Sequence, residues 1–230
     1  MESFRPFSAE HAWAIAAGCF WMLIMLWLGK RGGSSEVWAR RILIGILLAA
    51  YPANLAAWSL ADAPRSLDNL LPFHLCDVAT LLAAISLWKK NDLLAAMTYF
   101  WGLAATMQGL LTPALSLNFP HPAFFSFFIQ HIAIVITALY LPIVAGWRPR
   151  RPLMKTVGKV WLYSIAYLAC AMGINRLLGT NFAFASRPPD NPSLIDHLGP
   201  WPWYLAAMAA IALGIFSLLA LPFLRKSPHG

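Results

Sequence analysis

Seven long apolar segments divide this chain of 230 residues, and they restrict what it can fold into more than any other feature. An α-helix needs about 20 mostly apolar residues to cross a bilayer, and tilt accommodates segments that are somewhat shorter or longer. The segments run from Ala12 to Leu28, Val37 to Leu60, Leu71 to Trp88, Leu93 to Leu111, Ala123 to Ala145, Val157 to Leu178 and Trp201 to Leu224. We therefore predict an all-α protein that forms one integral membrane domain of seven transmembrane helices over residues 1–230.

The composition agrees with a membrane protein. Hydrophobic residues make up 60% of the chain and charged residues 11%, which is too little polar surface to coat a soluble globule. A formal net charge of +8 would suggest a nucleic-acid partner in a soluble protein. Here the basic residues stand in short runs between apolar segments, so we expect no nucleic-acid partner and interpret the charge as a topology signal.

The distribution of basic residues predicts the orientation of the chain. All but four of the 17 Lys and Arg residues follow segments one, three, five and seven or lie in the linkers there. The four exceptions on the opposite side are Arg5, Arg65, Arg176 and Arg187. Because Lys and Arg concentrate in cytoplasmic loops, we expect the N-terminus outside and the C-terminus in the cytoplasm. Helical spans also indicate a bacterial inner (cytoplasmic) membrane as the location.

Polar side chains inside the apolar segments gather at one depth. At about 1.5 Å per residue, Cys76 lies about 8 Å and His131 about 12 Å below the outer starts of their segments, while Gln108 and Asn175 lie about 5 Å from the outer ends of theirs. Four further polar residues belong to the same outer region: Tyr51, Asn54, His74 and Asp77. Ionisable groups inside a membrane span are costly, so this layer predicts a functional site near the outer leaflet.

The stretch from Leu71 to Thr80 carries three of these groups, but helical geometry separates them. Residues at i and i+3 share a face, whereas i and i+2 do not, so His74 is expected near Asp77 and away from Cys76, unless Pro72 makes the start of the segment irregular. His131, from another helix at a similar depth, is the better partner for the thiol. A cysteine deprotonated by a histidine is the arrangement used for acyl transfer through a thioester.

Structural explanations compete with these functional ones. Gln108, Asn175 and Asn54 are also typical of hydrogen bonds between helices, and a buried His131 can serve the same purpose. Asp77 can form an ion pair with Arg176 or orient His74. The opposed directions of His74 and Cys76 disfavour joint metal ligation, so we expect no metal. No cofactor motif is present, and Cys19 and Cys170 are expected to be apolar filler.

Several blocks in chain order resemble the bacterial YwaF-type integral membrane proteins. They are Pro72-Phe-His-Leu-Cys-Asp77, Tyr99-Phe-Trp-Gly-Leu103 with Gln108 and Leu111-Thr-Pro113, Phe119-Pro-His-Pro122 with Phe127-Phe128 and His131, Asn175 with Leu178-Gly-Thr-Asn181, and Leu198-Gly-Pro-Trp-Pro-Trp-Tyr204. That family is similar to the eukaryotic transmembrane protein 164 group, acyltransferases that remodel ether phospholipids. The more distant androgen-induced-gene-1-type lipid hydrolases use threonine in place of the cysteine.

The resemblance implies that Cys76 is the acyl-accepting cysteine and His131 the histidine that serves it, with Asn181 among the supporting residues. The function it implies is that of a membrane lipid acyltransferase, which passes the chain from a phospholipid to a lysolipid. Family analogy supports a reaction class and no particular substrate. The alternative is a transporter or lipid-binding membrane protein without enzymatic activity, in which the polar layer holds a ligand. Nothing in the sequence sets an oligomeric state.

Overall fold

The computed structural model of the chain describes residues 4–60, 66–190 and 192–224, and all regular elements within them are helical. The long helices are α1 (Ala9–Arg31), α2 (Gly33–Ser59), α4 (Leu75–Trp88), α7 (Pro122–Ile143), α8 (Leu153–Leu178) and α9 (Trp203–Ala220). The shorter elements are α3 (Leu67–Leu70), α5 (Asp92–Trp101), the π-helix η1 (Gly102–Thr106), α6 (Met107–Leu111) and the 3₁₀ turns η2 (Phe182–Phe184), η3 (Leu194–His197) and η4 (Leu221–Phe223).

Six helical segments of the described residues are long and apolar enough to cross a membrane. They correspond to six of the seven expected segments, which confirms the all-helical fold and its membrane character. The segment expected over 93–111 is not among the six. It is helical from Asp92 to Leu111, but the π-helix Gly102–Thr106 divides it into α5 and α6.

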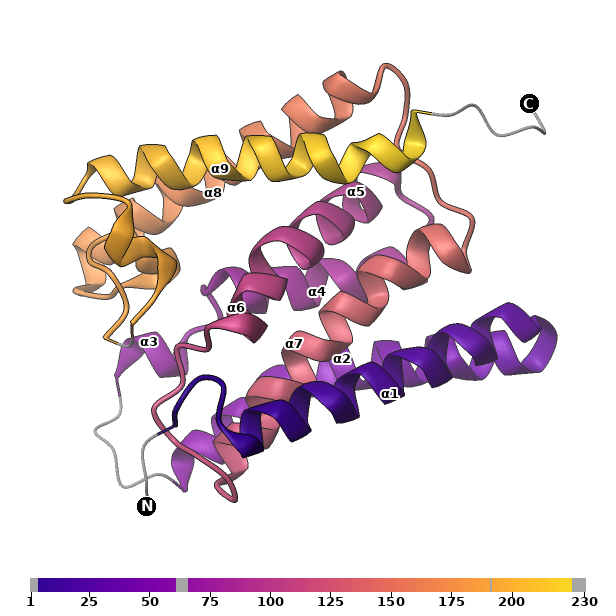
Figure 1. The fold of residues 1–230 in the computed structure, drawn as a ribbon, viewed down its shortest axis with the longest axis horizontal. Helices are drawn as coiled ribbons and strands as arrows, with labels where there is room; N and C mark the ends of the chain where they lie inside the picture. Colours follow the sequence, from indigo (N-terminus) through magenta and orange to yellow (C-terminus); the bar gives the residue numbers. More distant parts are fainter. Residues whose placement is uncertain (1–3, 61–65, 191, 225–230) are drawn as a thin grey trace.

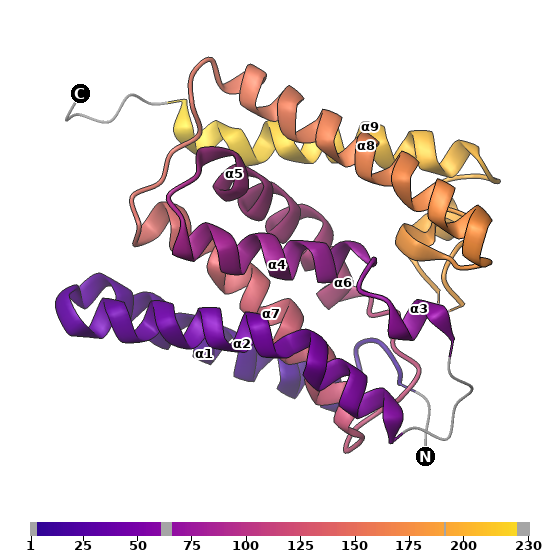
Figure 2. The same ribbon diagram turned by 180° about the vertical axis from the view of Figure 1, so that it is seen from behind.

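Helix α7 is the centre of the bundle. The most apolar window of α7 is 72% buried, against 17% for that of α1, so α7 is enclosed by protein where α1 has a free face. It contacts α1, α2, α4, α5 and α6. Figures 1 and 2 show α1 and α2 on one side of this centre and the pair α8 and α9 on the other. Gly102 permits a close approach to α7, because a Cβ there would lie 2.8 Å from the Cβ of Ala138.

The helix expected over 71–88 begins later than the sequence suggests, and this difference changes the position of Cys76. Leu71 is extended, with φ −100° and ψ 136°, as expected for a residue before proline. His74 is also extended, with φ −64° and ψ 151°, and serves as the N-cap of α4. Cys76 is therefore the second residue of its helix, and the residues from Leu71 to His74 do not have the helical rise from which its depth was calculated.

The helix ends define two ends of the molecule, which we call the site end and the basic end. The site end contains the starts of α1, α4, α7 and α9 and the ends of α2, α6 and α8, on the left in Figure 1. The basic end holds the opposite helix termini, on the right in the same view. Most of the basic runs belong to the basic end; Arg65, Arg225 and Lys226 lie outside the described residues.

Candidate functional site

The Cys76 thiol lies in the first turn of α4 at the site end. It is half-buried, and the thiol is free. The backbone amides of Cys76 and Asp77 lie close to it. The first turn of a helix presents amide groups that lack intrahelical acceptors, together with the positive end of the helix dipole. Both effects favour an oxyanion that forms beside the thiol.

A hydrogen-bond network joins this turn to α7. The Gln130 side-chain amide donates to Asp77 Oδ1 at 3.0 Å and to Thr80 Oγ1 at 3.0 Å. The Thr80 hydroxyl donates in turn to the Cys76 carbonyl at 2.7 Å. The start of α4 is thereby held against one buried residue of the central helix. A buried donor or acceptor without its partner costs about 1–3 kcal/mol, so these bonds constrain the position of the Cys76 turn.

The orientation of His131 is set by α7 and by its neighbour α6. Its Nδ1 lies 2.8 Å from the Phe127 carbonyl oxygen, and its ring stacks on that of Phe127 with centroids 4.0 Å apart. A carbonyl can only accept, so Nδ1 carries the hydrogen and Nε2 of the neutral ring holds a lone pair. No other described residue donates to Nε2. His131 thus has the tautomer that a general base requires.

Gly109 on α6 provides the space that the His131 ring occupies. A Cβ at position 109 would lie 3.2 Å from Cδ2 and 3.4 Å from Nε2 of that ring. Any residue with a side chain would therefore press on the imidazole edge that carries the free lone pair.

Cys76 and His131 belong to two helices that contact each other, α4 and α7, but no hydrogen bond joins them among the described residues. The connection runs through Gln130, which precedes His131 in the chain and binds the residue after Cys76. His74 lies within electrostatic reach of both Asp77 and His131. A thiol, an imidazole and a second histidine thus lie on neighbouring elements, α4 with its N-cap and α7.

His74 and Asp77 have other partners besides each other. The His74 ring packs edge-on against Phe182, with centroids 5.2 Å apart. The Asp77 amide donates to the His74 carbonyl at 3.0 Å, while its carboxylate accepts from Gln130. Asp77 forms no ion pair with Arg176 within the described chain.

Asn175 and Asn181 organise the loop that follows α8. Asn175 Oδ1 accepts from Thr180 Oγ1 at 2.9 Å and from the Phe182 amide at 2.8 Å, while its Nδ2 donates to the Phe182 carbonyl at 3.0 Å. Asn181 Oδ1 accepts the Ser186 and Arg187 amides, both at 3.1 Å. These side chains hold Phe182 against His74 and so form part of the wall of the site.

The remaining predicted residues connect neighbouring elements at the site end. The Tyr51 hydroxyl donates to the Leu70 carbonyl at 2.6 Å, and Asn54 Oδ1 accepts from Ser126 at 3.1 Å. Gln108 donates to Thr112 Oγ1 at 3.0 Å, which keeps its amide at the end of its own helix. Each of these three therefore has a structural partner.

Two residues absent from the sequence prediction belong to the site. Gln130 has a detectable signal, because it is the one side-chain amide in the apolar segment of α7 and directly precedes His131. Tyr167 on α8 donates to the Phe73 carbonyl at 2.8 Å and lies within electrostatic reach of Cys76 and Asp77. Nothing in its sequence context distinguishes Tyr167 from an ordinary aromatic residue in a membrane helix.

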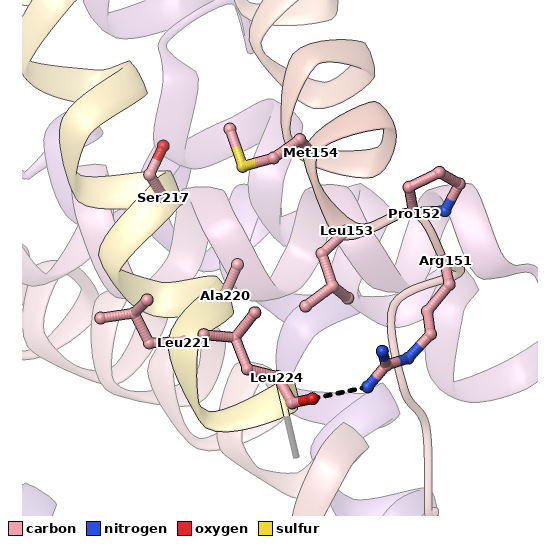
Figure 3. A pocket seen from close by; sticks show the side chains of 8 residues that line it. All are labelled: Arg151, Pro152, Leu153, Met154, Ser217, Ala220, Leu221 and Leu224. Carbon is pink, nitrogen blue, oxygen red and sulfur yellow. Dashed lines mark hydrogen bonds between the residues drawn. The ribbon is translucent and has the colours of Figure 1, made fainter. Parts of the chain in front are cut away.

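The described residues contain no group of three or more His, Cys, Asp and Glu side chains placed to hold a metal. Two surface grooves lie at the basic end, away from Cys76. The larger, of about 550 Å³, separates the start of α8 from the end of α9. Figure 3 shows Arg151 beside it, with Nη2 donating to the Leu224 carbonyl at 2.8 Å, and Met154 and Ser217 on the two facing helices. Apart from Arg151 and Ser217, its lining residues are apolar.

Comparison with known proteins gives a family match over nearly the whole chain. The model described as the TMEM164 family matches residues 6–220. An uncharacterized protein of Treponema pallidum (strain Nichols) is 25% identical over 170 residues, which cover 72% of this chain and 67% of that protein. No solved structure matches the chain. The matched range includes every residue of the candidate site.

Proposed function

Because this chain belongs to the TMEM164 family, we propose that it is a membrane lipid acyltransferase in which Cys76 carries the acyl chain and His131 transfers the protons. The observation that carries the proposal is the geometry of His131. Its Nδ1 is bound to the Phe127 carbonyl, so a lone pair remains on Nε2, in the helix that also anchors the Cys76 turn through Gln130. A nucleophile and a base on adjacent helices are the minimum for covalent acyl transfer.

In the first half-reaction the thiolate of Cys76, whose proton His131 has taken, attacks the ester carbonyl of a phospholipid. The oxyanion that forms lies beside the start of α4, where backbone amides are available to stabilise it. The ester C–O bond breaks, the leaving lysolipid oxygen takes the proton from the His131 imidazolium, and a thioester remains on Cys76. The side-chain amides of Gln108 and Asn175 already donate to other groups of the protein, so the backbone amides of α4 are the better oxyanion donors.

In the second half-reaction a lysolipid hydroxyl gives its proton to His131 Nε2 and attacks the thioester carbonyl. The C–S bond breaks, the Cys76 thiolate leaves, and the new ester carries the chain. Transfer of the Cys76 proton to His131 requires the two side chains to come within hydrogen-bond reach of each other. Catalytic hydrogen bonds commonly tighten only when substrate is bound, so we place this contact in the complex with the lipid.

The proposal is tested by looking for the intermediate. After incubation with phosphatidylcholine that carries a labelled acyl chain, the purified protein is expected to hold the label on Cys76, and neutral hydroxylamine is expected to release it. Mass spectrometry of the three cysteine peptides locates the adduct, with the exposed Cys19 and Cys170 as internal controls. Equal labelling of all three thiols, or none, would favour a lipid-binding or transport protein.

We also propose that the segment from Asp92 to Leu111 crosses the bilayer as a seventh span, so that the two termini lie on opposite sides of the membrane. We place the N-terminus outside and the basic end in the cytoplasm of a bacterial cell. The support is the charge asymmetry, since basic residues mark cytoplasmic loops. The orientation is measured by introducing a cysteine near Arg150 and adding a thiol reagent to either side of the membrane. The cysteine is expected to react only from the cytoplasmic side. Reaction from outside would reverse the orientation.

A further inference from the structure

The smaller groove at the basic end has features that the proposed acyl transfer does not use. It has a volume of about 410 Å³, within the range of ligand-sized pockets, and lies between the ends of α1 and α7 and the turn η4. Two cations, Lys30 and Arg148, line it together with apolar and aromatic side chains. The other lining residues are Tyr99, Leu139, Pro142, Ile143, Pro222 and Phe223.

No described residue neutralises the two cations of this groove. No carboxylate lines the groove. The nearby acidic side chains of the described basic end have other partners, since Glu36 binds Arg40 at 3.0 Å and Asp92 binds Arg150 at 2.5 Å. Lys30 and Arg148 form no ion pair with any described residue. The groove therefore presents two positive charges above an apolar floor.

The Arg148 guanidinium is held in place before any ligand arrives. Its Nη1 donates to the Pro142 carbonyl at 2.8 Å and to the Trp147 carbonyl at 2.9 Å, and its Cζ lies 5.6 Å from the centre of the Phe223 ring. Nε and Nη2 are left to donate to a ligand. A fixed guanidinium loses little freedom on binding and suits the oxygen geometry of a phosphate.

An aromatic cluster supports the groove and contains an unused donor. The rings of Tyr99, Trp147 and Phe223 lie 5.5 to 6.0 Å apart in pairs. The Trp147 indole N–H is buried and has no acceptor within the described structure. A buried polar group without a partner is uncommon and often marks a place where something outside the chain binds.

We propose that this groove binds an anionic phospholipid from the leaflet at the basic end. Lys30 and Arg148 hold the phosphate, and an acyl chain lies along Leu139, Ile143 and Phe223. Basic pockets between membrane helices attract anionic head groups. A zwitterionic lipid supplies no net charge to match the two cations, and a free phosphate ion leaves the apolar floor uncovered. The site is distinct from Cys76, which lies at the other end of the bundle.

The test uses the full chain in phosphatidylcholine nanodiscs that contain spin-labelled phosphatidylglycerol. Electron paramagnetic resonance measures the fraction of labelled lipid whose motion the protein restricts, and hence its affinity relative to phosphatidylcholine. In the double variant Lys30→Gln/Arg148→Gln this selectivity is expected to fall roughly thirtyfold, because each basic side chain near the surface contributes appreciably to the binding of anionic lipid. Arg148→Lys, which keeps the charge, is expected to stay within about threefold of the unchanged protein.

The matched control removes the same number of charges at the same end, outside the groove. Lys89→Gln/Lys90→Gln alters two exposed side chains and is expected to keep the selectivity. Equal losses in the two double variants would indicate a diffuse surface effect and overturn the proposal, as would full selectivity in Lys30→Gln/Arg148→Gln. Release of the labelled lipid by inorganic phosphate alone would identify a soluble anion as the ligand and overturn it as well.

Discussion

Replacing Cys76 with alanine is expected to abolish acyl transfer, with a loss of about a thousandfold or more, because no thioester can form without the thiol. The measurement is the transfer of a labelled acyl chain from phosphatidylcholine to lysophosphatidylcholine in proteoliposomes. The side chain is half-buried and small, so the substitution removes little packing. The thermal unfolding midpoint is therefore expected to change only slightly, which separates a lost reaction from a lost fold.

Matched variants make the Cys76 result specific. Cys19→Ala and Cys170→Ala alter exposed thiols on other helices and are expected to keep full activity. Cys76→Ser keeps the size of the side chain but supplies a far weaker nucleophile, so it is expected to lose nearly as much activity as alanine. Sustained transfer by Cys76→Ala would mean that the reaction passes directly from donor to acceptor, or that the residue belongs to a binding site alone.

The second large effect is expected at His131. Replacement by asparagine keeps a polar side chain but removes the base, and loss of general acid–base catalysis typically lowers a rate by about 10²–10⁴-fold. The same transfer assay measures it, together with the rate at which the Cys76 adduct appears. Both half-reactions use the imidazole, so the adduct is expected to form slowly and also to be consumed slowly. If the Cys76 adduct forms at an unchanged rate in His131→Asn, the histidine does not act in the first half-reaction.

Gly109→Ala tests the position of the imidazole without removing it. The new Cβ would lie 3.2 Å from Cδ2 of His131, so the ring has to shift by a few tenths of an ångström. A small displacement of a catalytic group commonly costs about tenfold or more in rate. Alanine favours a helix over glycine by about 1 kcal/mol, so stability is expected to hold or rise while activity falls. A fall in stability with activity retained would contradict a role of this contact in catalysis.

The apolar segments could be predicted from the sequence because secondary structure inside a membrane follows from local composition. A segment of Leu, Ile, Ala and Phe that is long enough to cross the bilayer has no alternative to helix there. Six of the expected segments appear as such helices, with ends that differ by a few residues. The interruption before α4 also had a local cause in Pro72, although its consequence for Cys76 came only with the backbone angles of Leu71 and His74.

The hydrogen-bond and ion-pair partners of the polar side chains could not be predicted in the same way. Asp77 was expected to meet Arg176 or orient His74, and its carboxylate binds Gln130. Depth along a helix follows from counting residues, but the partner of a side chain depends on how each helix is rotated and crossed against its neighbours. Those quantities are set by contacts between segments far apart in the chain.

What the sequence by itself determined is therefore the helical membrane fold and the two unlike ends of the molecule, because each depends on residues close together in the chain. Only the tertiary structure decided that Cys76 opens its helix, that Gln130 holds that turn, and that Gly109 leaves room for His131. The physical reason is that hydrophobic burial acts on any long apolar segment, whereas a hydrogen bond forms only at a short distance and in a fixed direction.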